Sequence, residues 1–181
     1  MAGLYYYFVE GECERVLLRA FMHAEESEYH ICPGKIEVLN VICEKISPAK
    51  ARTIKKGTKV VFVFDTDVKK TDLLEDNIQT IVNYSSLDYN DVLFIQSCKT
   101  LEDELVYACE NVTDVNKILG TTSREDFKKK LIKHKDIVSR LKNLGFRIDR
   151  MWSRSPGEPF LSMNYHQDFK SLLVLNKHWL Q

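Results

Sequence analysis

The chain has 181 residues, of which 44% are hydrophobic and 29% charged, and its formal net charge at neutral pH is zero. This length suits one well-packed domain. The balanced charge excludes the overall basic character of many nucleic-acid-binding proteins, although a local patch or a bound cation can attract an anion. No apolar run is long enough to cross a bilayer, and the N-terminus lacks the basic start of a signal peptide. Five cysteines without a C-x-x-C pair argue against a disulfide framework, so we expect a cytoplasmic protein.

Strand and helix signals alternate along the N-terminal part of the chain. Two apolar runs, Leu4–Val9 and Val60–Phe64, are typical of strands buried on both faces. In chain order we expect a strand over Leu4–Val9, a helix through Phe21, a strand over Ile36–Cys43, a short helix within Glu44–Thr53, a strand over Val60–Phe64, a helix over Thr71–Val82, a strand over Asp91–Ser97 and a helix from Thr100 toward Cys109. This alternation predicts an α/β fold, a three-layer sandwich with a mainly parallel central sheet of about four to five strands.

The C-terminal part is predicted to be mostly helical. A capping box at Ser123–Asp126 opens a long basic amphipathic helix that runs through Leu144 and stops at Gly145. We expect a strand over Phe146–Trp152, a loop at Ser155–Pro159 and a helical tail over Asp168–Leu180. Residues 1–115 would then form the core, and residues 116–181 a helical or mixed C-terminal extension packed on it as part of one compact unit.

Three carboxylates are expected at the ends of two buried strands. Asp65 and Asp67 lie two residues apart, so in extended backbone both side chains point the same way. Glu10 ends the first strand, and functional groups of parallel sheets gather at the carboxyl ends of strands. Like charges aimed at one small volume repel each other unless a cation lies between them, and oxygen ligands suit Mg²⁺ or Mn²⁺. The sequence therefore predicts a divalent-cation site formed by Glu10, Asp65 and Asp67, with Glu14 as a further candidate ligand.

The same segments resemble a known family. Phe8–Glu14 resembles the V-E-G-x-x-E opening of Toprim domains, especially the OLD-type and RloB-like small Toprim nucleases. Val61–Asp67 resembles their D-x-D strand, Ile36–Cys43 lies where that fold has its second strand, and Asp91–Leu105 resembles its fourth strand and the acidic helix that follows. The resemblance covers roughly residues 4–110 and implies a Toprim variety of the Rossmann-like sandwich.

This resemblance implies that Glu10, Asp65 and Asp67 are catalytic residues that hold Mg²⁺ or Mn²⁺ for phosphodiester chemistry. By position, the candidates for a second metal or for support of the site are Glu14, Ser97, Glu102, Asp103 and Glu104. A lysine also serves the OLD-type members, and the residues that compete for this role are Lys69, Lys70 and Lys99. The OLD-type ATPase part has no counterpart here, so a partner ATPase or self-association is a candidate interaction.

The leading hypothesis is a small metal-dependent nuclease that hydrolyses DNA or RNA, in phage defence or nucleic-acid processing. Candidate contacts to the nucleic acid are Lys69, Lys129, Lys133 and Arg154. The basic run beginning at Lys128 can equally be a solvated helix face. Aspartates are common in turns, and glutamates near a helix start complement its dipole.

Two further functions stay open at this point. The same acidic triad can hold Mg²⁺ in a module that binds nucleic acid or a partner protein and cuts nothing. A receiver-like phosphoacceptor domain also gathers acidic residues at strand ends, but it needs an acidic pair after the first strand, and here the pair follows the third. A zinc site from His23, His30, Cys32 and Cys43 fits no standard spacing.

Overall fold

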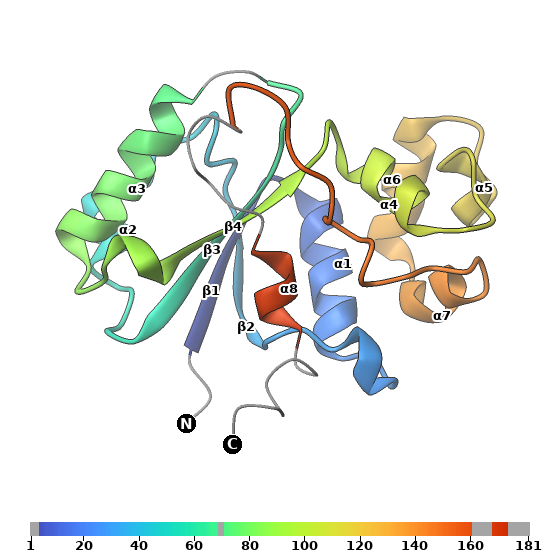
Figure 1. The fold of residues 1–181 in the computed structure, drawn as a ribbon, viewed down its shortest axis with the longest axis horizontal. Coiled ribbons are helices and arrows are strands. Elements are labelled where there is room, and N and C mark those ends of the chain that lie inside the picture. The colour runs from blue at the N-terminus through green and yellow to red at the C-terminus, as the bar shows by residue number, and fades with distance from the viewer. Residues whose placement is uncertain (1–3, 69–70, 161–167, 174–181) are drawn as a thin grey trace.

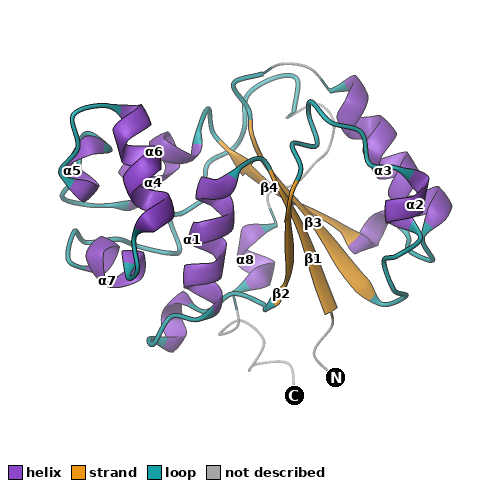
Figure 2. Ribbon diagram, turned by 180° about the vertical axis from the view of Figure 1, so that it is seen from behind, coloured by secondary structure: helices purple, strands orange, loops and turns teal. Residues whose placement is uncertain are grey.

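The computed structural model describes residues 4–68, 71–160 and 168–173. Within these residues, four parallel strands form one sheet in the order β2-β1-β3-β4 (Figure 1). The strands are β1 (Leu4–Val9), β2 (Gly34–Val38), β3 (Thr58–Asp65) and β4 (Val92–Ser97). Helices cover both faces of the sheet (Figure 2), which confirms the predicted α/β three-layer sandwich with a parallel central sheet.

The helices divide unevenly between the two faces. One face carries α2 (Pro48–Ala51) and α3 (Asp72–Tyr84). The helices beyond the other face are α1 (Glu12–Met22), α4 (Leu101–Ala108), α5 (Asn116–Leu119), α6 (Arg124–Lys133), α7 (Ile137–Lys142) and α8 (Phe169–Leu172). Short 3-10 turns lie at Ser27–Tyr29 and Tyr89–Asp91. Among the described residues, none of these helices combines the length and the apolar character needed to cross a membrane.

Alternating side chains of the strands build a core on each face. Tyr7 and Val9 of β1 pack with α1 and the C-terminal helices, whereas Tyr6 and Phe8 pack with α2 and α3. Buried side chains of the extension, among them Phe127 of α6, join the same cluster as α1. Residues on both sides of position 115 therefore share one hydrophobic core.

The chain reverses its direction of winding between β1 and β3. From β1 it passes through α1 to β2 on one face, and from β2 it returns across the other face through α2 to β3. In parallel sheets, a crevice opens outside the carboxyl ends of two strands at such a switch point. Val9 pairs with Val63 in register, so Glu10 and Asp65 lie on either side of this crevice.

The predicted second strand is displaced and shortened. It begins at Gly34 rather than at position 36 and ends at Val38, and the apolar residues beyond it form a turn packed into the core. Fully buried Asn77 explains why this turn needs no strand partner: its amide donates to Val41 O and Glu44 O, and its carbonyl accepts from Ile46 N–H. A side chain of α3 thereby supplies the hydrogen bonds that a sheet would otherwise provide.

The C-terminal predictions need three corrections. The single helix expected over 123–144 is wrong, because Asp136 caps a new helix by accepting from Ser139 N–H and the chain becomes extended at His134. The strand expected over 146–152 is also wrong: this stretch consists of turns, with one isolated bridge between Cys109 and Phe146. The short helix α5 has no counterpart among the elements predicted from the sequence. The expected tail helix is described only as Phe169–Leu172, and positions 174–180 lie outside the described residues.

Gly34 allows β2 to lie close to β1, which gives a stability prediction. A Cβ at position 34 would lie 2.5 Å from Tyr5 O and 2.8 Å from both Tyr5 Cβ and Tyr7 Cε2. We expect Gly34→Ala to lower the free energy of unfolding by about 2–3 kcal/mol in chemical denaturation, as forced overpacking does. Gly157→Ala is the matched control, because nothing lies within 4 Å of its added Cβ. Equal stability of the two variants would contradict this account of the strand contact.

Candidate metal centre at the edge of the sheet

Four carboxylates gather at the carboxyl edge of the sheet, and we call them the acidic cluster: Glu10, Glu14, Asp65 and Glu102. Glu10 follows β1, Asp65 ends β3, and Glu14 and Glu102 lie in the first turns of α1 and α4. Glu14 and Glu102 are buried, with 6% and 2% of their surface exposed, whereas Glu10 and Asp65 are half-buried. The structure thus brings two predicted ligands, Glu10 and Asp65, together with two predicted supporting residues.

The local backbone fixes Glu10 against Asp65. The Asp65 N–H donates to Glu10 Oε2 over 3.0 Å, and the Glu10 N–H donates to Val63 O over 3.2 Å. Gly11 caps the start of α1 and leaves room for Glu14, because Glu14 Oε2 lies 3.2 Å from the place of a Cβ on residue 11. A side chain at position 11 would therefore crowd the Glu14 carboxylate.

Burial and mutual repulsion both disfavour the charged state of the cluster. Burial first, and then the neighbouring charges of Glu14 and Glu10, raise the pKa of Asp65 to about 8, against hydrogen bonding from Ser97 that lowers it. Burial is also the main reason that the pKa values of Glu10 and Glu14 are raised. Positive charge placed among these groups would reverse the effect.

Two oxygens of the cluster lack hydrogen-bond donors. Among the described residues, Asp65 Oδ1 and Glu102 Oε1 are buried side-chain oxygens without a hydrogen-bond partner. Glu102 Oε1 is ion-paired with Lys128 Nζ over 3.3 Å, so Asp65 Oδ1 is the oxygen of the two that has neither a donor nor a salt-bridge partner. Unsatisfied buried acceptors are rare in folded proteins and call for an explanation such as an ion.

The carboxylates do not form a finished coordination shell. In the described parts of the chain, no three His, Cys, Asp or Glu side chains are arranged to hold a metal ion. The donor chemistry fits Mg²⁺ or Mn²⁺, because every ligand candidate in the cluster is a carboxylate oxygen.

Lys128 contributes positive charge to the acidic cluster, although it is not among the residues predicted for the site. It extends from α6 toward Glu102, and its charge also lowers the pKa values of Glu10 and Glu14. In the sequence it is one lysine of a basic run. The available signal is its place three residues before buried Leu131, on the side of α6 that packs toward α1.

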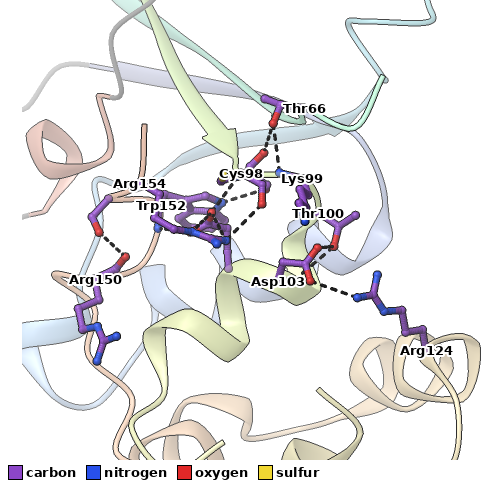
Figure 3. Close-up of polar contacts among 12 residues, drawn as sticks. Thr66, Cys98, Lys99, Thr100, Asp103, Arg124, Arg150, Trp152 and Arg154 are labelled. Atoms are coloured by element: carbon purple, nitrogen blue, oxygen red, sulfur yellow. Dashed lines mark hydrogen bonds and ion pairs between the residues drawn. The ribbon is translucent and has the colours of Figure 1, made fainter. Parts of the chain in front are cut away.

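Asp67 lies at the margin of the cluster. The argument that Asp65 and Asp67 point the same way requires extended backbone through both residues, but β3 ends at Asp65. Thr66 follows the end of β3 and bonds to the backbone at the end of β4. Its N–H donates to Ser97 O and to Lys99 O, and its hydroxyl donates to Ser97 O (Figure 3). Asp67 is consequently exposed, although its charge still raises the pKa of Glu10.

Other predicted supporting residues have structural partners. Asp103 accepts from the Thr100 hydroxyl at the start of α4 and pairs with Arg124 over 3.1 Å (Figure 3). Lys99 is exposed, with a left-handed backbone (φ 76°), and its N–H donates to the Thr66 hydroxyl. Ser97 is fully buried and is the register partner of Asp65 across β3 and β4. Of these, Ser97 directly adjoins the acidic cluster.

The residues predicted to contact nucleic acid differ in exposure and in their partners. Lys129 and Lys133 are exposed on α6, and Lys129 pairs with Glu125 one turn earlier. Arg154 instead pairs with fully buried Glu104 over 2.8 Å. It also donates to Cys98 O, just after the end of β4 (Figure 3). Lys69 lies outside the described residues.

Comparison with protein-family models, with curated proteins and with solved structures finds no significant match to this chain. The Toprim resemblance accordingly stays a prediction that rests on the sequence motifs.

The raised pKa of Asp65 predicts how stability depends on pH. Its carboxyl titrates near pH 3.8 when unfolded and near pH 8 in the fold, so between these values the folded state binds more protons. The free energy of unfolding should therefore fall as pH rises through this window in the absence of divalent cations. Since one pKa unit corresponds to about 1.4 kcal/mol, the decline amounts to a few kcal/mol.

Asp65→Asn should flatten this decline and make the protein more stable than wild type at pH 8, measured by chemical denaturation in EDTA. Glu10 and Glu14 titrate in the same direction, so some slope should remain. Asp149→Asn, at an exposed position that pairs with Arg147 away from the cluster, is the control and should keep the wild-type slope. Identical slopes for wild type and Asp65→Asn would contradict the burial of an uncompensated charge at position 65.

Proposed function

We propose that the chain binds Mg²⁺ or Mn²⁺ through the acidic cluster and uses it to hydrolyse phosphodiester bonds in nucleic acid. The observation that carries the proposal is Asp65 Oδ1, a buried carboxylate oxygen without a hydrogen-bond partner, within a set of mutually repelling carboxylates. A divalent cation satisfies such oxygens and removes the repulsion in one step. The ligands would be Glu10, Glu14 and Asp65, with Glu102 completing the set.

The place of the cluster supports a site that a substrate can reach. Glu10 and Asp65 lie at the switch point of the sheet, where ligands of open α/β folds bind. Both are half-buried, whereas Glu14 and Glu102 close the inner side. A ligand would approach Glu10 and Asp65 from solvent, and the buried carboxyl groups of Glu14 and Glu102 would lie behind them.

A bound divalent cation would polarise a phosphodiester and lower the pKa of bound water. The chain's own residues would hold and orient the reactants. Lys128, with 55% of its side chain exposed, offers a positive charge to a non-bridging phosphate oxygen next to the carboxylates. Lys129 and Lys133 lie on the same helix, and their exposed charges suit the backbone phosphates of DNA or RNA.

The direct test is cleavage of single- and double-stranded DNA and RNA by the purified chain with Mg²⁺ or Mn²⁺. We expect cleavage that EDTA abolishes, and a loss of more than about 100-fold in Asp65→Asn. Losing a ligand should cost more than the 10- to 100-fold typical of losing a group that only orients one. Asp149→Asn is the matched control, because Asp149 is exposed and pairs with Arg147 away from the cluster.

Each outcome of this test separates two functions. Equal cleavage by wild type and Asp65→Asn would overturn the nuclease proposal. Cation binding without cleavage of any substrate would replace it with a Mg²⁺-binding module that recognises nucleic acid or a partner protein.

A further inference from the structure

Trp152, from the C-terminal extension, reaches the end of β4. Its side chain is buried, with 1% of the residue exposed, and lies beside Cys98 and Arg154 (Figure 3). The indole Nε1–H donates to Ser97 Oγ over 3.1 Å, a contact between residues 55 positions apart in the chain. Both partners are buried, so water does not compete for this hydrogen bond.

The chemistry of the indole fixes the direction of the serine hydroxyl. An indole N–H only donates, so Ser97 Oγ must accept from it, and the single hydroxyl hydrogen is left for another acceptor. Asp65 is the register partner of Ser97 on the neighbouring strand, and hydrogen bonding from the Ser97 side chain lowers the pKa of the Asp65 carboxyl against the effect of burial. Asp65 Oδ1 is buried and has no donor in hydrogen-bond geometry.

Trp152 is itself held firmly. Its backbone N–H donates to Glu104 Oε2 over 3.1 Å, and its ring packs edge-on against Phe169 at 4.8 Å between centroids. Glu104 is in turn fixed by Arg154 and by the Cys98 N–H, at 2.8 Å each. The left-handed backbone of Trp152 (φ 49°) is uncommon for a non-glycine residue and persists where several contacts determine it.

We propose that Trp152 is a positioning residue of the acidic cluster, acting through Ser97 to orient the Asp65 carboxylate so that Oδ1 stays available to a divalent cation. The inference rests on the proposed function and assigns the extension a role in it. Residues that orient a metal ligand through a hydrogen bond affect metal affinity by about 10- to 100-fold. Trp152 would act in this way from outside the strands that carry the ligands.

The experiment is Mn²⁺ titration calorimetry on the full-length chain. We expect Trp152→Phe, which keeps an aromatic ring against Phe169, and Ser97→Ala each to weaken Mn²⁺ binding by about tenfold. The double variant should be no weaker than Ser97→Ala alone, because both changes break the same chain of hydrogen bonds. Ser153→Ala, in the same turn but exposed, is the control and should bind as wild type does.

A second readout does not depend on how well Trp152→Phe folds. Mg²⁺ should shift the NMR resonance of the Trp152 indole N–H in wild type, assigned with a Trp179→Phe variant, and Ser97→Ala should abolish the shift. Multiplied effects in the double variant, or wild-type affinity in both single variants, would overturn the positioning role alone. Absence of any Mn²⁺ or Mg²⁺ binding by wild type would overturn the proposed function together with this inference.

Discussion

Repulsion among buried carboxylates is the constraint on which the candidate site depends. Burial raises the pKa values of Glu10, Glu14 and Asp65, and the charges of the cluster raise them further. A protein gains nothing in stability from such an arrangement unless it is neutralised. Lys128 offsets one part of it at Glu102, and the cation that we propose would offset the rest. The loss of folding stability that these buried carboxylates cause is also the reason that we expect them to bind positive charge.

Several elements of the described chain keep these groups in place. The switch point puts Glu10 and Asp65 on neighbouring strands, Gly11 leaves room for the Glu14 carboxylate, and Glu102 lies in the first turn of α4. The C-terminal extension adds Lys128 on one side and Trp152 on the other. Since the extension shares a hydrophobic core with α1, its contribution to the site follows from the same packing that stabilises the sheet.

Local sequence patterns predicted the layers of the fold and the strand ends well. The apolar runs at Leu4–Val9 and Val60–Phe64 are strands, and the acidic residues that follow them, Glu10 and Asp65, are neighbours in the structure. Patterns failed where a distant partner decides the conformation. Asn77 converts an expected strand into a turn, and Asp136 divides an amphipathic run into two helices. Lys128 and Trp152 act across the tertiary fold, so no local pattern distinguishes them from other basic or aromatic residues.

The central claim, that the acidic cluster binds a divalent cation, is tested most directly by crystals of the protein grown with Mn²⁺. Anomalous diffraction locates the ion without reference to any activity. The account predicts a single strong peak, or a close pair of peaks, within bonding distance of Asp65 Oδ1, with Glu10, Glu14 and Glu102 drawn toward it. No peak at saturating Mn²⁺, or a peak bound only by surface carboxylates elsewhere, would contradict it.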